Sequence, residues 1–239
     1  DAFIKFANAV PFYGKVGVCI DHTNAAVIIP HIKRPVVTFG LYKDAEVRGS
    51  NLRYNQNQTI FDVLVNNENL GEFCIHVPGE HNVNNALGAV TLALQLDIKV
   101  EKIHAGLDQY NGVRRRFDIK YTLENGIIIV DDYAHHPFEV TSTIQAAKSG
   151  WDRRLITIFQ PHLFTRTRDF YQDFAKAFQK ADILIVTDIY QAREMPIPGI
   201  TAEIISDTAK NMGHKHVEYI PDQTQIAARL SDIAKSKDI

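Results

Sequence analysis

The stretch GIIIVDDYAHHP, residues 126–137, decides the fold of the second half of the chain. Its β-branched residues 127–130 predict a strand that is buried on both faces of a largely parallel sheet. Ionisable side chains then follow almost without interruption: Asp131, Asp132, Tyr133, His135 and His136. Ligands of open α/β sheets bind beyond the carboxyl ends of the strands, so this stretch is a candidate site. The alternative is a polar loop whose aspartate caps a helix that starts at Pro137.

Composition limits the class of protein. The 239 residues are 45% hydrophobic, which is enough for one large core or two ordinary ones. A formal charge of −2 argues against a nucleic-acid partner, and the lack of a long apolar run argues against a membrane partner. Cys19 and Cys74 lie in predicted strands, which favours buried thiols over a disulfide. These features predict a cytoplasmic protein.

The first half of the chain combines a parallel unit with an antiparallel ribbon. The pattern predicts an initial helix over residues 1–12, then strand, helix and strand at 15–20, 24–32 and 36–39. Alternating hydrophobicity over 46–77, with a turn at 66–71, predicts the ribbon. Two helices follow, one beginning near Asn82 as N-cap and one over 100–110.

The start of the first of these two helices is a second candidate site. His81 and Asn85 are four residues apart, so they share one side of the first turn. A helix N-terminus offers unpaired backbone N–H groups to a polar ligand. The alternative for His81, Asn82 and Asn85 is helix capping alone.

A domain boundary near residue 113 divides the chain into predicted domains 1–113 and 114–239. Asn125-Gly126 predicts a hairpin between strands at 118–123 and 127–130. Helices and strands then alternate, with helices at 137–149, 168–178, 201–211 and 222–234 and strands at 155–159, 183–187 and 216–219. This alternation predicts an α/β fold with a Rossmann-like second domain.

The loops after three of these strands are polar and should meet at one edge of the sheet. The predicted crevice contains His135, His136, His162, Arg166, Arg168, Tyr190, Arg193 and Glu194. Cations and imidazoles in this mixture suit an anionic substrate. A zinc site at His135, His136 and His162 is a weaker alternative, because adjacent histidines diverge and no cysteine is near, so we predict no metal site there. The basic run at 114–116 is either a solvated face or a phosphate contact.

Five motifs in register resemble those of the Mur ligase family. They are G-x-H-N-x-x-N-A at 79–86, G-x-x-R-R-F-D at 112–118, D-D-Y-A-H-H-P at 131–137, Q-P-H-x-F-T-R-T at 160–167 and P-I-P-G at 196–199. D-D-Y-A-H-H-P together with Q-P-H resembles the alanine-adding members most. The resemblance implies the rest of a Mur-type central ATPase domain, followed by a Rossmann-like C-terminal ligase domain.

The resemblance also implies an activity. Such enzymes use ATP and Mg²⁺ to join the carboxylate of UDP-N-acetylmuramate to L-alanine through an acyl phosphate. The reaction belongs to peptidoglycan synthesis, and hence to cell wall biogenesis, cell shape and cell division. By position in the motifs, ATP would be bound by His81, Asn82, Asn85, Arg116 and Asp132, and the substrates by Tyr133, His135, His162 and Arg166. Arg116 and His135 would be the catalytic residues.

The sequence departs from the family in several places. The glycine-rich phosphate loop that ends in Lys-Ser/Thr is absent, and the magnesium ligands are expected upstream of residue 1. The N-terminal UDP-binding domain and the closing glycine-rich strand are absent as well. Leu163 stands where many members carry arginine. We therefore expect a fragment that is inactive alone.

Two alternatives remain open. One is a ligase of the same superfamily that recycles murein peptides. The other is a non-catalytic module that binds a nucleotide.

Overall fold

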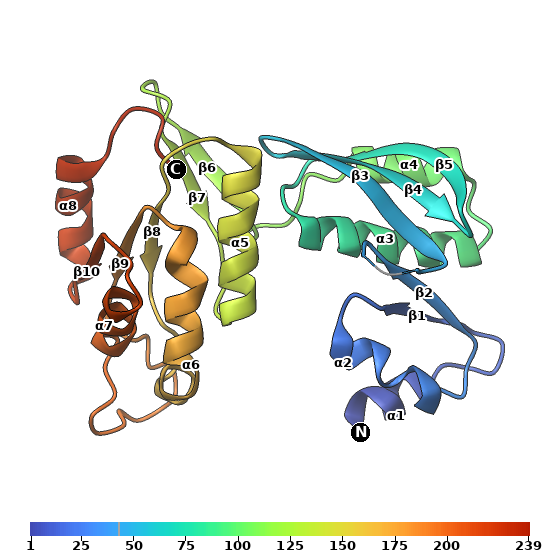
Figure 1. Ribbon diagram of the computed structural model, residues 1–239, viewed down its shortest axis with the longest axis horizontal. Coiled ribbons are helices and arrows are strands. Elements are labelled where there is room, and N and C mark those ends of the chain that lie inside the picture. The colour runs from blue at the N-terminus through green and yellow to red at the C-terminus, as the bar shows by residue number, and fades with distance from the viewer. Residues whose placement is uncertain (43) are drawn as a thin grey trace. The chain divides into compact units, whose positions relative to one another are not determined.

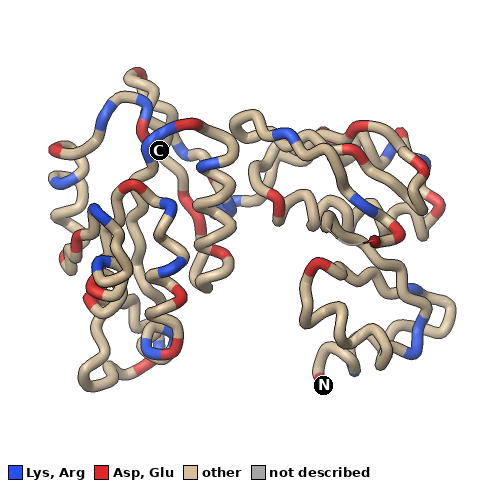
Figure 2. The backbone as a smooth tube through the Cα atoms, viewed as in Figure 1, with Lys and Arg blue, Asp and Glu red and all other residues tan. Residues whose placement is uncertain are grey.

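The computed structural model describes residues 1–42 and 44–239, and Figure 1 shows their course. The chain divides into two compact units, Asp1–Asn111 and Gly112–Ile239. Lys and Arg are interspersed with Asp and Glu along both units (Figure 2), in keeping with the small net charge. Among the described residues, no helix has the length and apolar character needed to cross a bilayer.

The first unit contains one five-stranded sheet in the order β1-β2-β3-β4-β5. The β1–β2 and β2–β3 pairs are parallel, and the β3–β4 and β4–β5 pairs are antiparallel, as the sequence predicts. The strands are β1 Val16–Cys19, β2 Val36–Gly40, β3 Val47–Asn55, β4 Gln58–Val65 and β5 Glu68–Ile75. The helices are α1 Ala2–Asn8, α2 Thr23–Ala26, the 3₁₀ turn η1 Ile29–His31, α3 Glu80–Gln95 and α4 Val100–Asp108.

Helix α3 packs against the sheet and completes the core of this unit. Its buried residues Val83, Leu87 and Val90 recur at helical spacing and join the cluster that contains Phe61 and Phe73. Gly88 allows the close approach, because a Cβ atom there would lie 3.1 Å from the ring of Phe39.

Three predictions for this unit are wrong in detail. The helix expected over 24–32 is broken, because Pro30 cannot donate its backbone N–H and its ring clashes with the preceding turn. The turn expected over 66–71 is shorter: Asn66 and Asn67 both have positive φ angles, 49° and 68°, so β5 resumes at Glu68. Helix α3 begins after Gly79, so Asn82 lies inside its first turn and is not the N-cap.

The second unit contains a parallel sheet in the order β10-β9-β8 and a separate antiparallel hairpin, β6-β7. The strands are β6 Asp118–Thr122, β7 Ile128–Asp131, β8 Ile156–Phe159, β9 Ile183–Val186 and β10 Val217–Tyr219. The helices are α5 Pro137–Gly150, α6 Phe164–Ala177, η2 Phe178–Lys180, α7 Glu203–Asn211, η3 Gln223–Gln225 and α8 Ile226–Ile233. One core joins α5, α6 and α7 to the strands through residues such as Ile144, Phe174 and Ile205.

The C-terminal residues lie between β7 and β8. The backbone N–H of Ile128 donates to the carbonyl of Asp238 at 2.9 Å, and that of Ile156 donates to the carbonyl of Ile239 at 2.7 Å. Both strands also line an apolar cavity of about 560 Å³. The expectation that β7 joins a parallel sheet is therefore wrong for this structure, because among the described strands β7 pairs only with β6, and Asp238 and Ile239 lie beside it.

An ion pair anchors this chain end. The guanidinium of Arg154 donates to both carboxylate oxygens of Asp238 and to the carbonyl of Ile233. Asp238 is only 4% exposed, and burial raises the pKa of its carboxyl group. Arg154 and the backbone N–H of Lys235 outweigh that effect and hold the pKa below its ordinary value.

Two helices of this unit start elsewhere than predicted. Helix α6 begins at Phe164 rather than at residue 168, so Arg166 lies on a helix and not in a loop. Helix α8 begins at Ile226, after a 3₁₀ turn in which Asp222 accepts a hydrogen bond from the backbone N–H of Thr224.

Candidate functional site

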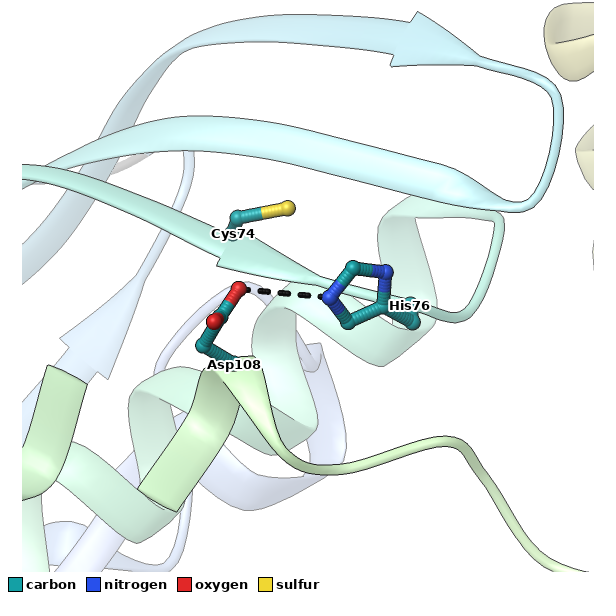
Figure 3. A group of neighbouring side chains, drawn as sticks. All are labelled: Cys74, His76 and Asp108. Carbon is teal, nitrogen blue, oxygen red and sulfur yellow. Dashed lines mark hydrogen bonds and ion pairs between the residues drawn. The ribbon is translucent and has the colours of Figure 1, made fainter. Parts of the chain in front are cut away.

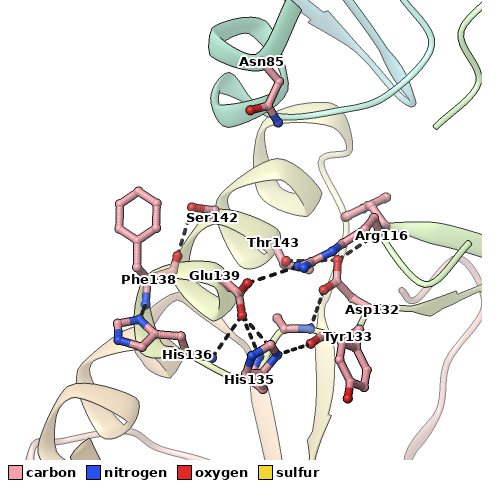
Figure 4. Close-up of polar contacts among 12 residues, drawn as sticks. Asn85, Arg116, Asp132, Tyr133, His135, His136, Phe138, Glu139, Ser142 and Thr143 are labelled. Atoms are coloured by element: carbon pink, nitrogen blue, oxygen red, sulfur yellow. Dashed lines mark hydrogen bonds and ion pairs between the residues drawn. The ribbon is translucent and has the colours of Figure 1, made fainter. Parts of the chain in front are cut away.

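The first turn of α5 is built around the carboxylate of Glu139 (Figure 4). One of its oxygens accepts the backbone N–H groups of His135 and His136, at 3.0 and 3.2 Å. In return, Nδ1 of His136 accepts the backbone N–H of Phe138, so the two side chains form a capping box. The sequence motif H-x-x-E therefore ends the loop and starts the helix.

Glu139 also pairs with Arg116, whose guanidinium lies 3.3 Å from its other oxygen. Burial raises the pKa of Glu139, but the backbone N–H of His135 and the guanidinium of Arg116 hold it below its ordinary value. The side chain of Arg116 is 49% exposed, so several of its five donors remain open to a ligand.

Asp132 connects three segments of the second unit. Its Oδ2 accepts the backbone N–H of Phe117 at 2.8 Å and the hydroxyl of Thr143 at 3.1 Å, and its Oδ1 accepts the N–H of Ala134 at 2.7 Å. A carboxylate has about four acceptor positions, so roughly one remains for a ligand. Asp132 thus has a structural role, but it does not cap α5, the role weighed for an aspartate from the sequence, because His136 is the N-cap.

Tyr133 lies beneath the guanidinium of Arg115, which is 4.4 Å from the centre of its ring. Arg115 also forms a 3.6 Å ion pair with Asp131, and its carbonyl accepts the backbone N–H of Tyr133. These contacts hold the basic segment 114–116 against the loop that follows β7. Tyr133 itself is 45% exposed.

The imidazoles of His135 and His162 face each other, with ring centres 6.4 Å apart. Nδ1 of His135 lies 2.9 Å from the carbonyl of Tyr133. Because a carbonyl only accepts, Nδ1 carries the proton and the lone pair of the neutral ring lies on Nε2. His135 therefore has the tautomer of a base that acts through Nε2.

His162 has the opposite tautomer. Its Nδ1 lies 3.3 Å from Nη1 of Arg166, which can only donate, so the proton of the neutral ring lies on Nε2. Burial lowers the pKa of His162, and the charges of Arg166 and His135 lower it further. His162 also stacks on Tyr190 at 5.6 Å, which adds that phenol to the cluster.

The N-terminus of α6 is held by a residue from a distant loop. Both oxygens of Glu194 accept from Thr165, one from the backbone N–H and one from the hydroxyl. These bonds lower the pKa of Glu194. Leu163, the residue before the first residue of α6, has a φ angle of 74°, which L-residues rarely adopt. Glu194 therefore positions this helix, which carries Arg166.

The structure brings together only part of the predicted crevice. Tyr133, His135, His162, Arg166 and Tyr190 form the cluster, with Arg116 and Glu139 beside it. His136 instead caps α5 and packs on Phe170, and Arg168 forms an exposed ion pair with Asp169. Arg193 is exposed and affects His162 only through its charge. His135, His136 and His162, considered above as zinc ligands, do not bring their ring nitrogens together as a metal-binding group among the described residues.

The candidate residues of the first unit lie on the first two turns of α3. The side-chain amide of Asn82 donates to the carbonyl of Pro78 at 2.8 Å, and that of Asn85 approaches Oδ1 of Asn82 at 3.4 Å. His81 is half-buried, and Asn85 is exposed. Gly79, with φ of 96°, permits the sharp entry into the helix.

Known proteins resemble both units. A family model described as Mur ligase middle domain matches residues 1–93, and one described as Mur ligase, glutamate ligase domain, matches residues 115–239. The chain belongs to the Mur ligase family.

Individual Mur ligases match across both units of the chain. The UDP-N-acetylmuramate–L-alanine ligase of Geotalea daltonii is 45% identical over all of this chain and 52% of its own length. The structure of UDP-N-acetylmuramate-alanine ligase from Thermotoga maritima has a TM-score of 0.70 and 29% identity, covering 84% of this chain and 43% of that one. The murein peptide ligase of Psychrobacter arcticus shares the fold, with a TM-score of 0.64 at 22% identity over 99% and 49% of the two chains. The chain spans about half the length of the curated relatives it matches.

Sequence reasoning missed two residues of this candidate site, Glu139 and Thr143. Glu139 could have been found, because a glutamate three residues after a helix cap is the signature of a capping box. Thr143 had no local signal, since its bond to Asp132 spans 11 positions.

Proposed function

We propose that the chain is part of an ATP-dependent ligase that joins the carboxylate of UDP-N-acetylmuramate to the amino group of L-alanine. The observation that carries this proposal is the 45% identity, over both units, to a protein named for that reaction. The sugar carboxylate is activated as an acyl phosphate, the amine attacks the acyl carbon, and phosphate leaves. The product is a precursor of peptidoglycan.

The residues of the second unit fit a nucleotide. Asp132 keeps an acceptor position that a ribose hydroxyl would fill, and Arg116 has open donors for phosphate oxygens. Bound ATP would supply the phosphoryl group. In the first unit we assign His81, Asn82 and Asn85 to the adenine and ribose, at a helix start that offers backbone N–H groups.

The carboxylates of this cluster do not fit a dedicated Mg²⁺ site. Asp131 pairs with Arg115, Glu139 pairs with Arg116, and Asp132 already accepts three hydrogen bonds. Mg²⁺ needs near-octahedral oxygen ligands, which these occupied groups do not offer. We therefore derive no step through the cation.

His135 is suited to receive the proton that the amine of L-alanine releases on attack. Its Nε2 carries the lone pair because Nδ1–H is held by the carbonyl of Tyr133. The bond from its backbone N–H to Glu139 fixes the position of this residue. His135 is thus proposed as a general base, and Arg116 as the cation that meets charge on the transferred phosphoryl group.

His162 and Arg166 are suited to hold a carboxylate. The Nε2–H of His162 and the guanidinium of Arg166 are both donors, and the two side chains touch each other. The exposed ring of Tyr133, 5.2 Å from that of His135, would bound the same space. We assign these residues to L-alanine and the muramoyl carboxylate.

A three-armed assay tests the proposal. The longer natural protein would be supplied with ATP, Mg²⁺ and UDP-N-acetylmuramate, and then with L-alanine, with a murein tripeptide, or with neither. Phosphate release that depends on L-alanine is expected. Release that depends only on the tripeptide would identify a recycling ligase, and release in neither arm would favour a non-catalytic module. The 239-residue chain alone should release no phosphate above background, because catalysis needs all reactants held by one assembled site.

A further inference from the structure

Three side chains that play no part in the proposed reaction meet beside the last strand of the first sheet. Cys74 and His76 alternate along the chain at β5, on the face opposite to the buried Phe73 and Ile75. Asp108 is the last residue of α4, which packs against β5. Figure 3 shows the three side chains next to one another.

The geometry of the group is that of potential metal ligands. The thiol sulfur, an imidazole nitrogen and a carboxylate oxygen all lie within 4.8 Å of one another. Nε2 of His76 and Oδ1 of Asp108 are 3.2 Å apart. Among the described residues, no other group of three such side chains comes together in this way.

We propose that Cys74, His76 and Asp108 bind a zinc ion. Thiolate, imidazole and carboxylate are the three ligand types that zinc takes in proteins. A tetrahedral ion at Zn–ligand distances of about 2.0–2.3 Å separates its ligand atoms by about 3.2–3.8 Å, so small side-chain rotations close the site. A water molecule completes the four positions. The thiolate excludes Mg²⁺ and Ca²⁺, which take oxygen ligands.

The surroundings of His76 support this assignment. Its other ring nitrogen, Nδ1, lies 3.2 Å from the side-chain amide of Gln58. With the amide turned so that its oxygen faces the ring, Gln58 accepts Nδ1–H and leaves Nε2 free to bind the ion. Histidine ligands of metals usually donate their second N–H in this way.

The charges around Cys74 also favour a dication. The carboxylates of Asp108 and Glu72 act on its sulfur through their negative charges. The same negative charges attract a cation, which binds the sulfur as the thiol proton passes to solvent. The bound ion would cross-link β5 to the end of α4, in addition to the contact that His104 makes with the carbonyl of Glu72.

Cobalt is the probe, because a Co²⁺–thiolate bond has an ultraviolet charge-transfer band. We expect the 239-residue chain to develop this band at one Co²⁺ per chain, and Zn²⁺ to abolish it by displacement. Cys74→Ser should remove the band. Cys19→Ser is the matched control, in the same unit and on another strand, and should retain it.

A second pair of variants covers the case in which Cys74→Ser alters folding. Asp108→Asn changes an exposed side chain and should weaken Co²⁺ binding on the order of 10-fold or more, while circular dichroism stays unchanged. His104→Gln, on the same helix but bonded to the carbonyl of Glu72, should bind Co²⁺ normally. No charge-transfer band in the unaltered chain, or a band that Cys74→Ser and Asp108→Asn leave intact, would overturn the proposal.

Discussion

The guanidinium of Arg116 lies 3.3 Å from the carboxylate of Glu139. The same carboxylate accepts the backbone N–H of His135. One acidic side chain therefore orders both residues to which we assign catalytic roles, the phosphate-facing cation and the general base. Its removal should disturb stability and catalysis together.

Glu139→Gln should lower the free energy of unfolding by about 0.5–1.5 kcal/mol, because the carboxylate that accepts two backbone N–H groups and pairs with Arg116 loses its charge. The amide keeps one acceptor oxygen but loses the charge that pairs with Arg116. Urea unfolding of the 239-residue chain measures the change. Asp169→Asn, which removes an exposed ion pair outside the cluster, is the control and should change stability little.

Glu139 should also make stability depend on acid pH. Its folded pKa is lowered, so its contribution is complete above the pKa of an unfolded glutamate, about 4.3, and is lost as the pH falls through the lower folded value. The difference in unfolding free energy between the unaltered chain and Glu139→Gln should therefore shrink below pH 4.3. A difference that stays constant from pH 7 to strong acid would contradict the assigned ion pair.

Asp132→Ala should have two separable effects. It leaves the backbone N–H of Phe117 without its acceptor, which should lower stability by about 1–3 kcal/mol. In the longer protein, Asp132→Ala should also weaken ATP binding by about 1.5–3 kcal/mol, because the contact with the ribose is lost. Asp132→Asn, which retains one carbonyl oxygen, should recover much of the stability. A destabilised Asp132→Ala protein with an unchanged Michaelis constant for ATP would leave Asp132 with a structural role only.

Arg166→Lys keeps the charge but removes the planar fork that contacts His162. We expect kcat/KM for L-alanine to fall at least about tenfold, equivalent to about 1.4 kcal/mol, with ATP affinity little changed. Arg168→Lys is the control, because Arg168 lies on the same helix but pairs with Asp169. Equal losses in the two variants, or a lower melting temperature with intact kinetics, would refute the assignment of Arg166.

At position 163, the glycine variant should be more stable than the alanine variant, which is the reverse of the usual order in a helix. At a φ angle of 74° a side chain is strained, by about 1–3 kcal/mol, so Leu163→Gly should be more stable than Leu163→Ala. At the exposed helical position 228, where φ is ordinary, Ala228→Gly should instead destabilise by about 0.5–1 kcal/mol. Urea unfolding of all three variants gives the comparison, and an alanine variant at 163 as stable as the glycine one would show no strain.

Local signals predicted most of the fold. Residues 127–130 and Asn125-Gly126 marked β7 and its hairpin, and alternation between 46 and 77 marked the ribbon. The failures came from distant partners. Helix α6 starts four residues early because Glu194 supplies acceptors at its first turn, and β7 stands apart from β8 because Asp238 and Ile239 lie between them.

The candidate site was also predictable only in part, because some of its contacts depend on distant partners. His162 and Arg166 follow the parallel strand β8 and meet His135 as expected, although the strand before His135, β7, lies outside that sheet. The direction of each side chain depends on its capping role, so His136 turned to Phe170 and Arg168 to Asp169. Cys74, His76 and Asp108 carried no motif, because a strand and a helix distant in sequence bring them together.

The burial of the chain end decides where a label can be attached. Asp238 and Ile239 lie between two strands and are tied down through Arg154, so an affinity tag or fluorescent reporter fused after Ile239 begins inside the fold. It would displace the bonds to Ile128 and Ile156 unless a long linker preceded it. Asp1 is exposed, and a reporter placed before it meets no such bonds. For immobilisation or fluorescence work on these 239 residues alone, a reporter before Asp1 is therefore preferable to one after Ile239.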